Sequence, residues 1–387
     1  MIASPIWDVV IVGAGLAGAS TAAVLSRKGA RVVLIDTREA YPACFKAEKI
    51  EPDQAELLRK FGLMEGLLPY ASRIHEVVSA QGGQLLRVLR LEQYGIFYQD
   101  LVNGVRAQLR SSVTWKLGRV RDVVPGPDVS HVTLMGGETI AARLVVLACG
   151  TGSNIHNSLG LRKCMIGRQH SFAIGFNIVP VDDGELFPFQ ALTYYPDKCS
   201  ARVGYLTLFP IRNVMRANLF VYRSPGEEWV YRFARDPEAI LVQSLPKLVQ
   251  LTGPFRITSR IEMSPIDLYR VEGHLRPGLA LLGDAYQSVC PTTGMGVSKV
   301  LTDVDVLCEC IPDWLATSGM NVEKITRYYD HPRKVAIDAK AIQRALYTRT
   351  LSTDASFRWR IYRRLKYFGI RMYGWADLQA RRRFGGK

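Results

Sequence analysis

Three glycines near the start of the chain have the spacing of a phosphate-binding loop. The apolar run Val9-Val10-Ile11-Val12 leads into Gly13-Ala14-Gly15-Leu16-Ala17-Gly18, and a helical pattern follows to about Lys28. In a G-x-G-x-x-G motif the first glycine permits a tight turn, the second admits a pyrophosphate and the third lets helix and strand pack closely. The helix N-terminus then offers N–H groups to the phosphates. We therefore expect residues 13–18 to bind a dinucleotide.

A carboxylate after the next predicted strand supports this interpretation. Asp36 follows the apolar segment Arg31–Ile35, completing a βαβ unit. Its side chain would accept hydrogen bonds from an adenosine ribose, and its charge would repel a 2′-phosphate. The unit should therefore bind FAD or NAD rather than NADP, with Thr37 and Arg38 beside the ligand.

A second glycine-rich segment distinguishes FAD from NAD. It reads Gly283-Asp284-Ala285-Tyr286-Gln287-Ser288-Val289-Cys290-Pro291-Thr292-Thr293-Gly294-Met295-Gly296-Val297-Ser298. This order resembles the G-D-A-A-H-x-x-x-P-x-x-G-x-G-x-N segment of FAD-dependent monooxygenases of the para-hydroxybenzoate hydroxylase type, a superfamily that is related to geranylgeranyl reductase-type flavoproteins. From Gly283 to Gly296 the spacing matches without a gap.

The resemblance implies roles for several of these residues. Asp284 would bond the ribitol chain of FAD, Gly283 would be a further cofactor contact, and Pro291 would lie beside the isoalloxazine ring. Gly294, Met295, Gly296 and Val297 would form a helix start near the flavin. A helix N-terminus there would stabilise the negative charge of reduced flavin.

Other matches to the superfamily are partial. The strand Leu144–Cys149 and Gly150 resemble an A-D-G-x-x-S segment of the superfamily. Cys149 stands in place of the aspartate, which in the hydroxylases is associated with FAD contact and with the use of a pyridine nucleotide. Cys149 by itself is typical of a small buried hydrophobe. Lys46 or Lys49 would neutralise the pyrophosphate and Gln99 would hydrogen-bond it, although solvated side chains explain them equally well. Val120 is a further expected cofactor contact, and Arg106 is a weaker candidate.

The superfamily implies an α/β fold with a discontinuous, doubly wound, Rossmann-like FAD-binding domain. We expect residues 1–75, 95–170 and 267–320 in this domain. Residues 76–94 and 171–266, with strand-like runs such as Phe172–Val179 and Ala201–Phe209, should form an inserted, mainly antiparallel β-sheet substrate domain. Residues 321–387 should form a helical C-terminal region. Val113–Val124 and His131–Leu134 are expected to form a strand pair.

Aromatic residues are dense in the predicted substrate domain, and most are expected to be core. Tyr194 and Tyr205 are our candidates, with Pro291, for the catalytic site, because a phenol can hydrogen-bond or deprotonate a phenolic substrate. No arrangement of residues suggests a metal site, so the redox work would belong to the flavin.

The charge of the chain is concentrated at its end. The 387 residues carry a formal net charge of +15, and residues 356–387 hold ten Lys or Arg against the single acid Asp377. In this segment Phe357, Ile361, Leu365, Phe368, Met372 and Trp375 recur at steps of three or four, which predicts a basic amphipathic helix. Its partner would be an anionic membrane surface or an acidic protein; the alternative is a helix docked on the protein's own core. Nothing in the sequence favours nucleic acid.

Composition and cysteine usage indicate the compartment. With 48% hydrophobic and 22% charged residues, the chain is typical of a globular protein. Seven cysteines without a C-x-x-C pair favour reduced thiols and a cytoplasmic location, with peripheral membrane contact left open. Because the first strand is predicted to begin by about Trp7, we expect no signal peptide.

The sequence therefore predicts an FAD-dependent monooxygenase. It would hydroxylate an aromatic or other apolar substrate with O₂ through a flavin C4a-hydroperoxide, with NAD(P)H as electron donor. Two alternatives stay open: a reductase or oxidase of the same superfamily, for example on isoprenoid double bonds, and a flavoprotein that modifies a side chain of a partner protein.

Overall fold

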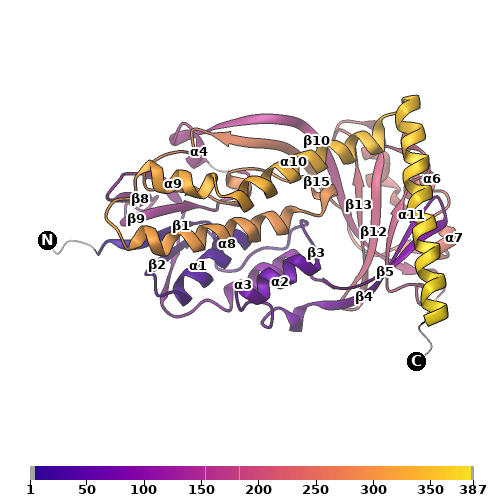
Figure 1. The fold of residues 1–387 in the computed structure, drawn as a ribbon, viewed down its shortest axis with the longest axis horizontal. Helices are drawn as coiled ribbons and strands as arrows, with labels where there is room; N and C mark the ends of the chain where they lie inside the picture. Colours follow the sequence, from indigo (N-terminus) through magenta and orange to yellow (C-terminus); the bar gives the residue numbers. More distant parts are fainter. Residues whose placement is uncertain (1–4, 153, 183, 385–387) are drawn as a thin grey trace.

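Two β-sheets lie side by side and a helical C-terminal segment crosses both in the computed structural model of the protein (Figure 1). The structure describes residues 5–152, 154–182 and 184–384. Ser153, residues 1–4 of the first predicted domain segment and residues 385–387 of the predicted tail lie outside the described residues.

The first sheet has seven strands assembled from separated parts of the chain. Its order is β6-β2-β1-β9-β8-β7, with β16 paired to β9. The strands are β1 (Trp7–Val12), β2 (Val32–Asp36), β6 (Val113–Leu117), β7 (Val120–Val124), β8 (Ser130–Leu134), β9 (Thr139–Leu147) and β16 (Leu279–Leu281). The pairs among β1, β2, β6, β9 and β16 are parallel. Their long apolar runs suit strands that are buried on both faces, and the predicted βαβ start is confirmed.

One sequence prediction for this sheet is wrong. Residues 113–124 do not form one strand paired to His131–Leu134, because β6 runs parallel to β2 and only β7 pairs antiparallel with β8. Gly118 separates the two, and its N–H donates to Asp36 O at 2.8 Å.

The second sheet has nine strands in the order β14-β10-β13-β12-β11-β4-β5-β3, with β15 paired to β10. The strands are β3 (Lys49–Ile50), β4 (Ser72–Gln81), β5 (Gln84–Gly95), β10 (Arg162–Pro180), β11 (Ala191–Tyr195), β12 (Val203–Ile211), β13 (Val214–Val221), β14 (Phe255–Ile257) and β15 (Glu262–Glu272). All its pairs are antiparallel except β11 with β4, so the mainly antiparallel prediction is confirmed. The predicted domain limits at 170 and 266 fall inside β10 and β15, which form one long ribbon.

Helices connect and cover the sheets. They are α1 (Leu16–Arg27), α2 (Pro52–Lys60), α3 (Tyr98–Arg106), α4 (Asn154–Ser158), α5 (Glu228–Arg235), α6 (Pro237–Ser244), α7 (Val249–Thr252), α8 (Gly296–Leu315), α9 (Val322–Tyr329), α10 (Pro332–Thr353) and α11 (Phe357–Phe384). Short 3₁₀ turns include η3 (Gly283–Ala285) and η4 (Pro291–Thr293). No helix among the described residues has an apolar stretch long enough to cross a bilayer.

The last helix packs on the second sheet by a face that the sequence did not suggest. α11 lies against β5 (Figure 1). Its buried side includes Tyr367 and Gly374. A Cβ at Gly374 would lie 2.2 Å from Leu86 O, so the glycine allows helix and strand backbones to touch. The apolar stripe noted in the sequence points the other way and is exposed.

Candidate active site

The first glycine motif forms a turn that only glycine fits. Gly13 follows β1 with φ +100°, and a Cβ there would lie 2.6 Å from Ala148 O. A Cβ on Gly18 would lie 1.9 Å from Gly13 O, so α1 packs directly on the turn. Gly15, the N-cap of α1, is different, because no atom lies within 4 Å of its Cβ position. The N-terminus of α1, with Leu16 and Ala17 in its first turn, is therefore bordered by open space on the side of Gly15.

Asp36 and Arg106 hold this turn in place. Asp36 Oδ2 accepts hydrogen bonds from Ala14 N at 2.7 Å and from Arg106 Nη2 at 3.1 Å, and Oδ1 accepts one from Arg38 N at 3.0 Å. Arg106 Nε donates to Ala14 O at 2.7 Å. Arg106 is thus a buried positioning residue. The sequence analysis made it only a weaker candidate, because its role depends on contacts that α3 makes with the ends of β1 and β2.

Other predicted contacts follow β2 and β9 or begin β7. Thr37 is exposed directly after β2, and Val120 begins β7 near the Gly118–Asp36 hydrogen bond. Cys149 is half-buried after β9, and its Cα borders Gly13. Gly150 has φ +72° and no atom within 4 Å of its Cβ position.

The two candidate lysines have different surroundings. Lys46 Nζ lies 5.5 Å from the ring centre of Tyr98, at the start of α3. Lys49 Nζ pairs with Glu51 at 2.9 Å, so its charge is already neutralised. Gln99, in the first turn of α3, is half-buried. Of these residues, Lys46 lies best to balance an anionic ligand.

Asp284 follows β16 at the point where the second motif begins. Burial raises the pKa of its carboxyl, and the positive charges of Lys46 and Lys299 oppose that rise. No hydrogen-bond partner of this carboxylate lies among the described residues, so it is free to accept hydrogen bonds from hydroxyl groups of a ligand.

A buried ion cluster fixes the turn that carries Asp284. Gly283 N donates to Asp303 Oδ2 at 3.2 Å, and Asp303 also binds Lys299 at 2.6 Å and Lys334 at 3.0 Å. All three charged side chains are fully buried, and Asp338 completes the balance of charge. The cluster therefore joins α8 and α10 to η3.

The second motif ends at an accessible helix start. Gly294 has φ +67°, and no atom lies within 4 Å of the Cβ position of either Gly294 or Gly296. Gln54 Nε2 donates to Gly294 O at 3.2 Å and ties α2 to this loop. Met295 and Val297 are buried beside it. The N–H groups of α8 thus face open space at the end of a 20-residue helix, whose dipole favours negative charge there.

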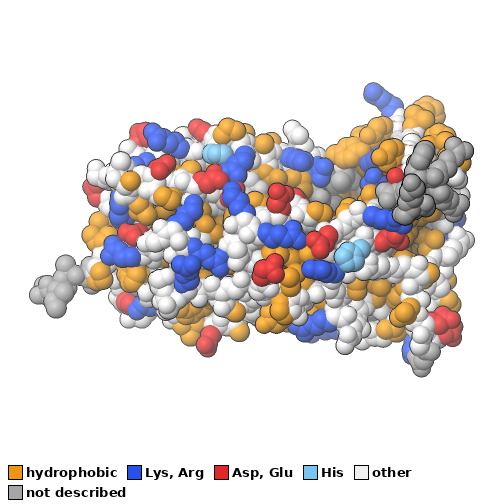
Figure 2. All heavy atoms as spheres, turned by 60° about the horizontal axis from the view of Figure 1, so that its bottom comes forward, with side chains coloured by type: hydrophobic (Ala, Val, Ile, Leu, Met, Phe, Trp, Pro, Cys, Tyr) orange, Lys and Arg blue, Asp and Glu red, His pale blue; other side chains and the backbone are white. Residues whose placement is uncertain are grey.

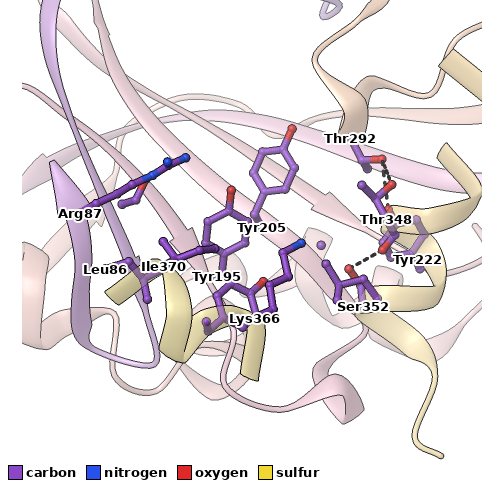
Figure 3. A pocket seen from close by; sticks show the side chains of 14 residues that line it. Leu86, Arg87, Tyr195, Tyr205, Tyr222, Thr292, Thr348, Ser352, Lys366 and Ile370 are labelled. Carbon is purple, nitrogen blue, oxygen red and sulfur yellow. Dashed lines mark hydrogen bonds between the residues drawn. The ribbon is translucent and has the colours of Figure 1, made fainter. Parts of the chain in front are cut away.

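A cavity of about 150 Å³ lies between Thr292, which follows Pro291, and the second sheet (Figure 3). Fourteen residues line it, and none is acidic. They come from β4, β5, β11, β12 and the end of β13, together with η4, α10 and α11: Ser79, Leu86, Arg87, Tyr195, Gly204, Tyr205, Tyr222, Thr292, Thr348, Leu351, Ser352, Lys366, Tyr367 and Ile370.

Phenols and hydroxyls give the cavity its polarity. Burial raises the pKa of Tyr205 well above its usual value and that of Tyr222 to about 12, so both stay protonated at neutral pH. Tyr222 OH donates to Thr292 Oγ1 at 3.1 Å, and Thr292 is 3.2 Å from Thr348 Oγ1 (Figure 3). The ring of Tyr205 packs against that of Phe220, with centroids 4.8 Å apart and the ring planes tilted by 50°. Tyr205 can therefore donate a hydrogen bond to a ligand, whereas the proton of Tyr222 is already donated to Thr292, and neither phenol acts as a base.

Tyr194 is not part of this cavity. Neighbouring residues of a strand point to opposite faces, and Tyr195 takes the cavity side. Tyr194 is buried in the apolar core of the second sheet with Phe176 and Leu206. The structure therefore brings together Tyr205 and the Pro291 loop but not Tyr194.

The sequence analysis did not identify the two cationic residues of the cavity, Arg87 and Lys366. The buried Nε of Arg87 has no hydrogen-bond partner among the described residues. Lys366 Nζ donates to Tyr347 OH at 2.9 Å, and burial lowers its pKa. A second face of the same helix could have indicated Lys366. This face carries Arg363, Tyr367, Ile370 and Gly374 at steps of four and three, and Lys366 lies beside it.

The residues present fit FAD. Two helix N-termini and the glycines 15, 150, 294 and 296 border open space, and Asp284 offers a carboxylate acceptor at the start of the second motif. Among the described residues, no group of three or more His, Cys, Asp or Glu could hold a metal ion. Fold and site together define a flavin-binding protein.

Comparison with known proteins agrees with this class. The FAD binding domain family matches residues 7–340, and the chain belongs to this family, so FAD is its cofactor. The aklavinone 12-hydroxylase of Streptomyces peucetius is 25% identical over 78% of the chain and 66% of its own length. The chain thus spans slightly less than two thirds of that relative.

Two further similarities cover a larger share of this chain and of the protein it is compared with. Digeranylgeranylglycerophospholipid reductase 1 of Methanococcoides burtonii is 23% identical over 84% of the chain and 78% of its own length. The crystal structure of p-nitrophenol 4-monooxygenase from Pseudomonas putida superposes with a TM-score of 0.76 at 18% identity, covering 94% of this chain and 93% of that one. The predicted resemblance to the monooxygenase superfamily and to geranylgeranyl reductases is confirmed, and the structural likeness shows the fold.

Proposed function

We propose that the protein is an FAD-dependent monooxygenase that hydroxylates a small aromatic or other apolar substrate, using O₂ and NAD(P)H. The observation that carries the proposal is the cavity beside Thr292, because it adjoins the loop expected to face the flavin ring. FAD, when bound, supplies the redox chemistry with O₂.

The chain's own residues would bind and orient the substrate. Tyr195 and Tyr205 give an aromatic wall, and Tyr205 keeps its proton, so it donates a hydrogen bond. Arg87 and Lys366 supply positive charge without an acidic neighbour in the lining. A phenolate or carboxylate oxygen on the substrate suits this pair. The N-terminus of α8 would favour negative charge on the cofactor.

Reduction of the flavin is the first test. The holoenzyme is mixed anaerobically with NADH or NADPH, with and without a panel of phenols, and the flavin absorbance is followed. Bleaching that a phenol accelerates is expected, followed on aeration by a product that has gained one oxygen atom. Absence of bleaching by either nucleotide with every phenol would contradict the self-reducing form of the proposal.

Cys149 favours a second candidate, a reductase or oxidase of the same superfamily. It stands where the hydroxylases carry an acid, and a relative is a digeranylgeranylglycerophospholipid reductase. Product mass separates the two, since a change of two hydrogens replaces the gain of oxygen.

A further inference from the structure

The exposed side of α11 carries an unusual set of large apolar residues. Their exposed fractions are Phe357 70%, Ile361 41%, Leu365 65%, Phe368 60%, Met372 48% and Trp375 59%. On a helix these positions form one stripe. The opposite side is the one that packs on β5 through Tyr367 and Gly374. Figure 2 shows hydrophobic side chains gathered at the end of the molecule where α11 runs.

Basic residues flank this stripe on both sides. With 3.6 residues per turn, Arg358 lies along one edge and Arg360 and Arg364 along the other, and all three are exposed. Residues 356–387 hold ten Lys or Arg against one acid. An exposed apolar stripe between rows of arginine is the pattern of helices that lie in the plane of a membrane interface.

We infer that the exposed side of α11 binds the surface of an anionic lipid bilayer. The apolar stripe would enter the boundary between headgroups and acyl chains, and the flanking arginines would contact lipid phosphates. A second copy of the chain is a poorer occupant, because pairing two such helices would bring together two strongly positive segments.

The same helix also closes the cavity. Its inner side provides Lys366, Tyr367 and Ile370 to the lining, so docking would place the cavity about 10 Å, one helix diameter, from the lipid. If the proposed function holds, an apolar substrate dissolved in the bilayer would reach the cavity past α11. The binding itself does not depend on that function.

Co-sedimentation of the holoenzyme with vesicles tests the inference without any substrate. Vesicles of phosphatidylcholine alone are compared with an equimolar mixture of phosphatidylcholine and phosphatidylglycerol, at low and high salt. The protein is expected to bind the mixed vesicles, and this binding should weaken as the salt concentration rises. Binding to phosphatidylcholine alone should be much weaker.

Variants identify the surface. The double change Leu365→Glu and Phe368→Glu should abolish binding, because it places acids in the stripe without touching the packed side. Replacing Arg358, Arg360 and Arg364 by Gln should weaken binding on the order of a hundredfold. Leu186→Glu, at a side chain that is 91% exposed elsewhere, is the matched control and should bind like the wild type.

Three results would overturn the inference. In the first, the wild-type protein stays in the supernatant with both kinds of vesicle. In the second, the double variant binds the mixed vesicles as well as the wild type does. In the third, light scattering shows that the wild type is a dimer and the double variant a monomer. The last would assign the stripe to a second copy. Retained flavin absorbance in every variant shows that the chain is folded.

Discussion

Packing of α11 on β5 can be tested with two glycines of the same helix. A Cβ at Gly374 would lie 2.2 Å from Leu86 O and 2.8 Å from Arg87 Cβ, whereas no atom lies within 4 Å of a Cβ at Gly369. Alanine gains about 1 kcal/mol of helix propensity over glycine at either position. At 374 the helix and strand must also separate by roughly 1 Å, and overpacking of this kind costs about 1–3 kcal/mol.

The two substitutions should therefore act in opposite directions. Gly369→Ala is expected to stabilise docked α11 by about 1 kcal/mol, and Gly374→Ala to destabilise it by a net amount of about 1 kcal/mol. Each corresponds to a change of about fivefold in the population of undocked helix. Hydrogen exchange of α11 amides, read by mass spectrometry, measures that population. Slower exchange in both variants would refute the packing described for Gly374.

Gly374→Ala should also change the cavity. Because Lys366, Tyr367 and Ile370 line it, a displaced α11 would widen it and raise the KM for a substrate. Gly369→Ala should leave KM unchanged, since that position touches nothing.

Three further predictions concern the rest of the molecule. Gly15→Ala should leave the unfolding free energy of the apoprotein within about 0.5 kcal/mol but weaken FAD at least about tenfold, as measured by quenching of FAD fluorescence; unchanged affinity would remove Gly15 from the site. Burial lowers the pKa of His170 and His274 from the ordinary 6.5, so the unfolded chain binds more protons below that pH. Stability should fall as pH drops below about 6.5, and urea midpoints of the two His→Gln variants should show a shallower fall. Asp303→Asn leaves two buried lysines under-compensated and should cost about 3–5 kcal/mol in urea unfolding. Glu309 is an exposed carboxylate of α8 that pairs with Lys60, and Glu309→Gln should cost less than about 1 kcal/mol. Equal costs would argue against a buried cluster.

Local signals in the sequence were sufficient for the first βαβ unit. Strand, turn and helix adjoin there, and the glycine pattern specifies a turn geometry that few other residues tolerate. The same holds for the loop before α8. Asp36 was identifiable because it ends a strand in a fixed relation to the motif. Arg106 was not, since nothing in α3 tells which of its side chains reaches back to that turn.

The lining of the cavity could not be predicted from the sequence. Its lining comes from segments between Ser79 and Ile370, and their meeting depends on the order of strands in the second sheet and on where α10 ends. Alternation along β11 separates Tyr194 from Tyr195, but periodicity alone does not tell which face is the core. Here helices α5 and α6 cover the Tyr194 side, which leaves Tyr195 for the cavity.

The orientation of α11 shows why hydrophobicity alone misleads. The stripe from Phe357 to Trp375 is the more apolar face of the helix, and the sequence left open whether the helix meets a membrane surface, an acidic protein or the protein's own core. The structure buries the opposite face instead, where Gly374 lets two backbones meet and Tyr367 fills the space beside it. Close approach gains contact with Leu86 and Arg87 of β5, which a bulky side chain at this position would prevent. What remains outside is an apolar surface with arginines along its edges, and a surface of that size and charge needs a partner that is both apolar and anionic.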